Sequence, residues 1–431
     1  MKYDLIVVGG GPGGLMAAKT AAEDGLKVLL VERRRRITQI NRACTQIFYL
    51  RKLTPVGTAE TGQRKKDGYL EPVSVDIESE KAKLNFHGPG FSVDFTGNLR
   101  PYLNWIQVSP SGHIIHRYPV NEGVWGFFLQ KEALAADLLT AAQNAGVEIL
   151  EETIGLGAEN TSEGVMVTVG TKSGEKTFQA KAAIAADGKR SKIVESVGLN
   201  KQREKFAPRG RKFVHFVMEG VEDDFPDSSF VSFTIPSINP FANMILSIGA
   251  NDTRVLGCMT VGNVPAPALI DRFIKHSKFA PWFRNATIVK GEATMGRRLG
   301  ALTPVKRPVA GNVVVVGDAG APSETWVQGA LACGFQAVKA IEKELDGRRG
   351  YEDYIQWWQR SFAFNTPEYL ELNKGLYPLN RVSTDEDIDF IYKRFGDRIG
   401  IPQLIVPNNM DIIKKERPSL HDKLIQSKAK K

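Results

Sequence analysis

The chain has 431 residues, of which 42% are hydrophobic and 24% are charged, so its length predicts two domains and an extension rather than a small binding module. Its net charge of +9 suits an ordinary basic surface or an acidic partner, and no basic run carries the interleaved aromatic residues of a nucleic-acid binder. No apolar run approaches the roughly 20 residues that cross a bilayer, and the sequence contains no recognisable signal peptide. We therefore expect a soluble, cytoplasmic protein, with peripheral membrane contact left open.

The beginning of the chain reads as a strand, a tight turn, a helix and a second strand. Residues 3–8 are mostly apolar, and apolar residues at helical spacing follow a glycine-rich turn. The second strand ends on Glu32, whose carboxylate can accept hydrogen bonds from ribose hydroxyls. A G-x-G-x-x-G pattern in such a unit predicts a dinucleotide site, because glycine permits the turn and lets the backbone approach a pyrophosphate. The loop residues are Gly9, Gly11, Pro12, Gly13 and Gly14.

A second part of the same site is predicted far along the chain. Residues 311–320 read as a buried strand that ends on Gly317 and Asp318, and a helix over residues 327–345 follows. An aspartate in that position can hold a ribityl hydroxyl, while N–H groups at the helix start face the polar edge of a flavin. This arrangement favours FAD as the cofactor. The helix-start residues predicted to contact it are Gln328, Gly329 and Ala330.

Three motifs, in the expected order, resemble the flavoprotein superfamily of aromatic hydroxylases, geranylgeranyl reductases and FixC-type dehydrogenases. The first is the segment 9–32 with Arg33 beside it, and the second is the turn at 185–191, which contains Asp187. The third begins with residues 298–304 and continues into the Gly-Asp motif. The resemblance implies one non-covalent FAD per chain, and it does not identify the reaction.

The resemblance also implies cofactor contacts outside these motifs. Lys131 stands where the superfamily usually has an arginine near the FAD phosphates, which implies a cation there without bidentate geometry. Cys44 stands where the reductases often have a cysteine, and it implies either a thiol near the flavin ring or a small buried residue. Trp326 lies in a loop that is shorter than in the superfamily, and it is expected either to line the flavin pocket or to act as a packing residue. The loop around Cys44 adds the predicted contacts Arg42 and Ala43.

The two parts of the dinucleotide site are far apart in the chain, so the predicted fold is α/β with a discontinuous Rossmann-like FAD-binding domain (GR2-type). An inserted antiparallel β-sheet is predicted to form the floor of a substrate site, and the C-terminal extension is predicted to be mainly helical. The predicted boundaries are 1–59, 121–199 and 296–350 for the FAD-binding domain, 60–120 and 200–295 for the substrate-binding domain, and 351–431 for the extension.

These features predict an FAD-dependent oxidoreductase of the reductase-like branch, in which flavin N5 exchanges a hydride with an apolar or unsaturated small molecule. One alternative is a flavin monooxygenase of the aromatic hydroxylase type, and a second is a non-redox binding protein on the same fold. The sequence contains one dinucleotide fingerprint, so electrons are expected from transiently bound NAD(P)H, from a quinone or from a protein donor, and we favour ferredoxin or electron-transfer flavoprotein. The six histidines are scattered, so no catalytic residue is assigned and no metal site is expected.

Overall fold

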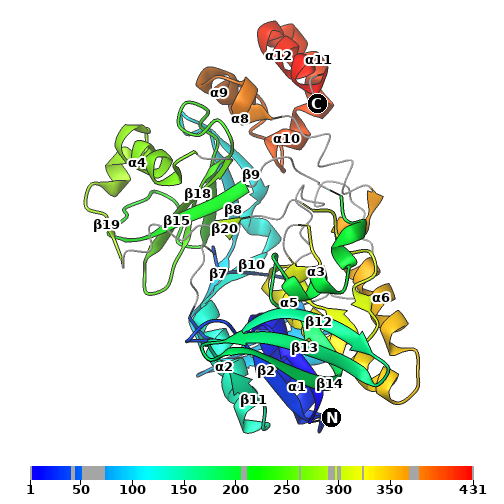
Figure 1. Ribbon diagram of the computed structural model, residues 1–431. Coiled ribbons are helices and arrows are strands. Elements are labelled where there is room, and N and C mark those ends of the chain that lie inside the picture. Colours follow the sequence, from blue (N-terminus) through cyan, green and yellow to red (C-terminus); the bar gives the residue numbers. More distant parts are fainter. Residues whose placement is uncertain are drawn as a thin grey trace.

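Two lobes and a C-terminal group of helices make up the molecule (Figure 1). The first lobe holds the N-terminus at the bottom of that view, and the second lobe and the C-terminal helices lie above it. The computed structural model describes residues 2–39, 44–50, 73–204, 211–261, 264–289, 297–298, 302–322, 325–367 and 378–429. The α/β architecture confirms the predicted fold class.

A mixed sheet of eight strands forms the centre of the first lobe. Its strands are β1 (Tyr3–Val8), β2 (Val28–Val31), β11 (Glu148–Leu150), β12 (Ile154–Thr161), β13 (Gly164–Thr171), β14 (Gly174–Ala185), β21 (Val309–Ala310) and β22 (Val313–Val315). The order is β11-β2-β1-β14-β13-β12, with β22 paired to β14 and β21 to β22. β11, β2, β1, the end of β14 and β22 pair in parallel. Their carboxyl ends therefore meet at one edge, where dinucleotides bind in sheets of this kind.

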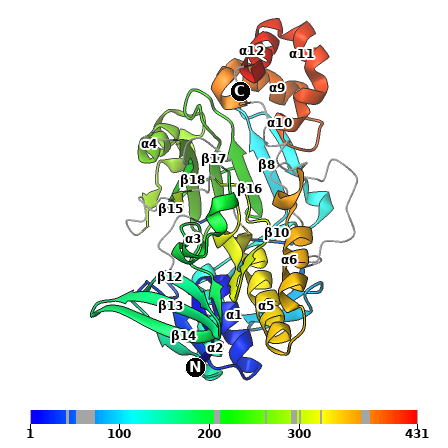
Figure 2. The same ribbon diagram turned by 45° about the vertical axis from the view of Figure 1, so that its right-hand side comes forward.

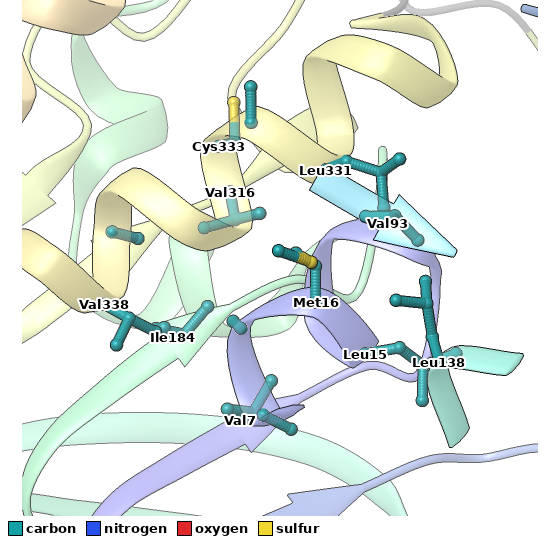
Figure 3. Packing of buried hydrophobic residues seen from close by; sticks show 14 of the residues in the cluster. Val7, Leu15, Met16, Val93, Leu138, Ile184, Val316, Leu331, Cys333 and Val338 are labelled. Carbon is teal, nitrogen blue, oxygen red and sulfur yellow. The ribbon is translucent and has the colours of Figure 1, made fainter. Parts of the chain in front are cut away.

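Helices from both ends of the chain pack on this sheet: α1 (Pro12–Glu23), α2 (Lys131–Asn144), α3 (Lys192–Ser196), α5 (Trp326–Leu345) and α6 (Gly350–Ser361). α1 and α5 approach closely, because a Cβ at Gly334 would overlap the carbonyl oxygen of Gly13. Figure 3 shows the apolar core beside this contact, which includes Met16, Val316 and Leu331. Figure 2 shows α6 alongside α5. Since α1 follows β1 and α5 follows β22, both helices start at the same edge of the sheet.

Two small antiparallel sheets adjoin the first lobe. One consists of β4 (Val73–Ile77), β5 (Ala82–Phe86) and β6 (Phe91–Phe95), and the other of β3 (Ile47–Tyr49), β10 (Gly126–Leu129) and β7 (Leu99–Tyr102). Phe91 stacks on Phe335 of α5 with 4.6 Å between ring centroids. Residues 73–95 thus pack on the first lobe, although the predicted boundaries include them in the substrate-binding domain. The domain boundaries themselves stay a prediction.

The second lobe is built on another eight-stranded sheet. Its strands are β8 (Asn104–Val108), β9 (Ile114–Tyr118), β15 (Arg211–Glu219), β16 (Ser229–Phe233), β17 (Met244–Ile248), β18 (Arg254–Val261), β19 (Thr287–Ile288) and β20 (Arg297–Arg298). The order is β19-β15-β18-β17-β16-β8-β9, with β20 beside β15. Val214, Phe216 and Met218 of β15 share a core with α4 (Ala266–His276). Because side chains alternate along a strand, His215 faces away from that core.

The C-terminal helices are α8 (Leu379–Val382), α9 (Asp385–Arg394), α10 (Pro402–Ile405), α11 (Met410–Glu416) and α12 (Pro418–Ala429). They pack on the edge of the second lobe, where Ile115 of β9 shares a core with Ile391 and Leu424. Asp389 of α9 accepts a hydrogen bond from the hydroxyl of Ser111 at 2.6 Å and so ties these helices to the sheet. Short 3-10 helices span Val120–Glu122, Leu199–Gln202, Ala280–Phe283, Gly317–Ala319, Ala363–Asn365 and Pro407–Asn409. In the described part of the chain, no helix combines the length and apolarity that crossing a membrane requires.

Candidate cofactor and active site

The glycine-rich loop between β1 and α1 has the shape that an anion site requires. Gly9 has φ of +109°, in the left-handed region that favours glycine. A Cβ at Gly14 would overlap the carbonyl oxygen of Gly9, so the helix can start close to the strand. A Cβ at Gly11, in contrast, would meet no heavy atom within 4 Å. The loop therefore leaves room for a ligand at Gly11, beside the N–H groups of the first turn of α1.

Glu32 is a buried carboxylate beside this loop, with 5% of its surface exposed. Its Oε2 accepts a hydrogen bond from the N–H of Gly10 at 2.6 Å, and its Oε1 accepts from Nε of Arg34 at 3.0 Å. Nη2 of Arg34 also donates to the carbonyl of Gly10 at 2.9 Å. Burial opposes ionisation of Glu32, but the hydrogen bonds and charge of Arg34 hold its pKa below the ordinary value. Glu32 is thus a fixed anion at the end of β2.

The cation on Glu32 is Arg34, a residue that the sequence analysis did not single out. The side chain of Arg33 is exposed, and its predicted contact with the cofactor stays a prediction. Residues two apart at the end of a strand point to the same side, which is the signal that favours Arg34. The predicted contacts Arg42 and Ala43 lie outside the described residues.

The turn after β14 packs against the glycine-rich loop. A Cβ at Gly9 would overlap the carbonyl oxygen of Ala186. Oδ2 of Asp187 accepts a hydrogen bond from the N–H of Lys192 at 3.1 Å, and Oδ1 is buried without a hydrogen-bond partner among the described residues. Burial raises the pKa of Asp187. The predicted residue Asp187 therefore lies beside the loop and retains an acceptor that a ligand could use.

The start of α5 closes the other side of the site. Oδ1 of Asp318 accepts hydrogen bonds from the N–H of Thr325 at 3.0 Å and from its hydroxyl at 3.3 Å, which fixes the residue before the helix. Gln328 is 6% exposed, and its Oε1 has no partner within the described chain. A Cβ at Gly13 would lie 2.8 Å from the carbonyl oxygen of Ala330, so α5 meets the glycine-rich loop here. A Cβ at Gly329 would lie 2.8 Å from the ring of Phe362.

Trp326 begins α5 and connects it to an aromatic cluster between the lobes, made of Tyr49, Tyr102, Trp105, Tyr118, Trp125 and Phe230. Its φ of +60° is unusual for a bulky residue. Its ring lies edge-on to Tyr49, with 4.9 Å between centroids, and 38% of its surface is exposed. The side chain of Trp125 is 1% exposed, and its ring centroid lies 5.7 Å from that of Tyr49 and 5.0 Å from that of Trp105. Trp326 thus packs on the aromatic cluster and also presents indole surface.

Cys44 and Lys131, both predicted cofactor contacts, lie together with a histidine that was not predicted. Nζ of Lys131 lies 3.9 Å from Sγ of Cys44, and the N–H of Lys131 donates to Oε1 of Gln46 at 2.9 Å. The N–H of Cys44 donates to Nδ1 of His215 at 3.2 Å. Because His215 belongs to β15 and Cys44 to the first lobe, this hydrogen bond crosses between the lobes. Lys131 lies next to the residue predicted near the flavin ring.

His215 is neutral in this setting. It is 4% exposed, and burial lowers its pKa to about 4. Since Nδ1 accepts a hydrogen bond, the proton of the neutral ring is on Nε2. Nε2 is buried without a hydrogen-bond partner among the described residues. Nothing in the sequence separates His215 from the other five histidines, because its partner Cys44 is 171 residues away in the chain.

Arg203 is a second residue that sequence reasoning did not identify. Its guanidinium donates to the carbonyl oxygens of Thr303 at 2.6 Å, Ala319 at 3.4 Å and Ala321 at 3.2 Å. Burial lowers the pKa of Arg203 to about 10. It therefore holds the backbone that follows Asp318, and no local sequence pattern reveals such a long-range contact.

The residues present fit an FAD molecule. The open space at Gly11, the buried carboxylate of Glu32 and the unpaired Oε1 of Gln328 offer a pyrophosphate cradle, a ribose acceptor and a buried polar contact. When bound, a flavin supplies hydride transfer at N5. The described residues contain no group of three or more His, Cys, Asp and Glu side chains placed to hold a metal ion.

Comparison with known proteins agrees with this site. Residues 4–37 match the family model described as FAD dependent oxidoreductase, and residues 124–319 match the FAD binding domain model. The chain is 24% identical over 406 residues to digeranylgeranylglycerophospholipid reductase 1 of Methanothermobacter thermautotrophicus, which covers 92% of this chain and 91% of the relative.

Solved structures share the fold. The structure of a geranylgeranyl bacteriochlorophyll reductase-like protein from Thermoplasma acidophilum superposes with a TM-score of 0.65 at 17% identity, covering 98% of both chains. A ternary complex of aklavinone-11 hydroxylase with FAD and aklavinone superposes with a TM-score of 0.52 at 18% identity, covering 80% of this chain and 63% of the hydroxylase. At these identities the likeness concerns the fold, which reductases and hydroxylases have in common.

The open space at Gly11 leads to a prediction about FAD. Gly11→Ala places a methyl group where the pyrophosphate is expected, so we expect the Kd for FAD to rise at least about tenfold, or about 1.4 kcal/mol. Flavin absorbance of the purified protein and titration of the apo-protein measure this change. The melting temperature of the apo-protein should stay the same, because the added Cβ meets no protein atom. Unchanged FAD affinity would show that the loop does not hold the cofactor.

The buried pair of Glu32 and Arg34 leads to a pH-dependent prediction. Arg34→Ala leaves the carboxylate buried without its cation, so we expect the apo-protein to lose about 3 kcal/mol of stability at pH 7. The pKa of Glu32 is lowered in the folded state, so its stabilisation is present above its ordinary pKa of 4.5 and is lost as the pH falls below it. The difference in melting temperature should therefore shrink toward pH 3. Arg35→Ala, at an exposed neighbour, is the matched control; an equal effect of both variants at pH 7 would contradict the assignment.

Proposed function

Because this chain is an FAD-dependent oxidoreductase of the superfamily that its sequence resembles, we propose that it is a reductase. In this proposal a hydride moves between flavin N5 and an unsaturated, largely apolar small molecule. The observation that carries it is the similarity to a prenyl-lipid reductase along both lobes, rather than along the cofactor-binding segments alone. The enzyme assignment sets aside the alternative of a non-redox binding protein.

The proposed cofactor contacts follow from the geometry of the site. The glycine-rich loop and the first turn of α1 hold the pyrophosphate. Glu32, fixed by Arg34, accepts the adenosine ribose hydroxyls, and Asp318 accepts a ribityl hydroxyl. The N–H groups at the start of α5 face the pyrimidine edge of the flavin. Further proposed contacts are Arg33, Arg42, Ala43, Cys44, Lys131, Asp187, Gln328, Gly329 and Ala330.

The aromatic cluster supports an apolar substrate. Trp326 at the start of α5 contacts Tyr49, and the rings continue through Trp125 to Trp105 in the second lobe. Arg117 lies over the ring of Trp105 at 3.9 Å from its centroid. Aromatic walls exclude water from a reacting centre and bind apolar chains through dispersion and burial. We therefore place the substrate against the exposed face of Trp326.

A flavin monooxygenase remains the alternative reaction. The aklavinone-11 hydroxylase shares this fold, and the fold alone does not decide between reduction and hydroxylation. None of the residues discussed above specifically favours hydroxylation. The similarity to a reductase, in contrast, extends over nine-tenths of both chains.

The proposal includes an electron source and a location. One dinucleotide fingerprint is present and FAD occupies it, so we propose an acidic protein donor, ferredoxin or electron-transfer flavoprotein, with NAD(P)H as the alternative. The net charge of +9 and the exposed Arg33, Arg35 and Arg36 support this donor. A protein donor makes flavin reduction slower at higher salt, since the charges are screened. We propose a cytoplasmic location, because a reducing compartment keeps the three free cysteines in the thiol form.

The reductase proposal predicts that chemically reduced enzyme passes its electrons to an unsaturated substrate without oxygen. Reduced enzyme, prepared with dithionite and mixed anaerobically with prenyl compounds, should return to oxidised flavin and yield one saturated bond per flavin. Absorbance follows the flavin, and mass spectrometry identifies the product. Product formation that requires oxygen, with an oxygen atom incorporated from it, would instead support the monooxygenase.

A further inference from the structure

The strongest unused feature of the site is the imidazole of His215. Its Nδ1 is engaged by the N–H of Cys44 at 3.2 Å, and its Nε2 is buried without a partner in the described chain. An unpaired buried donor is costly, and the cost is recovered when a ligand supplies an acceptor. Such a donor therefore marks a place where a substrate atom is expected.

The orientation of this ring is fixed from two sides. The hydrogen bond from Cys44 fixes Nδ1, and the ring of Phe213 meets the imidazole edge-on with 6.1 Å between centroids. Phe213 in turn lies over Gly257, the residue opposite His215 on β18, since a Cβ there would come 2.7 Å from its ring. Nε2 is the ring nitrogen farther from the strand backbone. It therefore lies at the end of the side chain, away from the backbone of β15.

The chemistry of the donor selects its partner. A neutral N–H donor suits an uncharged oxygen, because carboxylates and phosphates are bound more strongly by cationic donors. An oxygen conjugated to the reducible double bond gains negative charge as hydride arrives, and a preorganised donor in a dry site stabilises that charge.

We propose that Nε2 of His215 binds the carbonyl oxygen of an α,β-unsaturated carbonyl substrate. The inference rests on the proposed reductase function. The β-carbon takes a hydride from the reduced cofactor, the π electrons move to the carbonyl oxygen at His215, and the α-carbon takes a proton from solvent. The products are the saturated carbonyl compound and oxidised FAD, so two electrons and two hydrogens balance.

A matched series of probes with one carbon skeleton tests this inference: citral, geraniol and 2,6-dimethylocta-2,6-diene. These carry an aldehyde, a hydroxyl and no oxygen, respectively. We expect His215→Leu to weaken citral binding to the oxidised FAD enzyme at least about tenfold and to leave the hydrocarbon unchanged. His215→Gln, which offers both an acceptor to Cys44 and a donor to substrate, should recover most of the citral affinity. Flavin absorbance changes report binding without turnover.

The outcomes separate the inference from the proposed function. Equal weakening of all three probes by His215→Leu, or of geraniol alone, would overturn the carbonyl assignment. Selective loss of citral binding without any anaerobic reoxidation of reduced enzyme would support the role of His215 and contradict the reductase proposal. Nitrogen-15 spectra of the apo-protein give an independent check, because the inference requires the Nε2-protonated neutral ring at pH 7. The opposite tautomer would overturn it.

Discussion

The contact of backbone against backbone at the glycine-rich loop is the constraint on which the site depends. Gly14 lies against the carbonyl of Gly9, and Gly334 of α5 lies against the carbonyl of Gly13. Any side chain at these positions would separate α1, α5 and the sheet. Because glycine lets α1 and α5 approach the loop closely, the starts of both helices converge at one edge of the sheet. Their N–H groups therefore face the same space. Glu32, which is buried, and Asp187, which is half-buried, add acceptors beside that space.

The second lobe completes the site through a small number of contacts. The hydrogen bond between Cys44 and His215 joins a loop of the first lobe to β15, and the edge-on contact of Trp326 with Tyr49 leads into the aromatic cluster. In the proposed function, the first lobe supplies the cofactor contacts and the second lobe supplies groups for a substrate. This division explains how a common fold carries different reactions, since the second lobe can vary without disturbing the glycine-rich loop.

Local patterns predicted much of the fold and of the cofactor site. The turn from β1 to α1, the end of β2 at Glu32 and the run from β22 into α5 each depend on neighbouring residues, so the sequence reveals them. The antiparallel sheet predicted within residues 200–295 is present as β15, β18, β17 and β16. These features were accessible because glycine spacing and apolar periodicity are themselves local.

Contacts between distant segments could not be predicted. His215 and Cys44 are 171 residues apart, and Arg203 reaches Thr303 across 100 residues. Which of the four arginines after Glu32 pairs with it depends on the side of the chain that each side chain faces, and the sequence does not show this. The packing of β6 on α5 through Phe91 and Phe335 is likewise a tertiary contact without a local signature.

We infer that the flavin of bound FAD lies beside Cys44, at the junction of the lobes. Cys44 is partly exposed, whereas Cys258 and Cys333 are buried and burial raises the pKa of both thiols to about 12. The rate of alkylation by iodoacetamide therefore reports on Cys44, and peptide mass spectrometry locates the modified residue. The account predicts that saturating FAD slows this alkylation at least about tenfold relative to the apo-protein, because the ring covers the thiol. An unchanged rate at full FAD occupancy would contradict it.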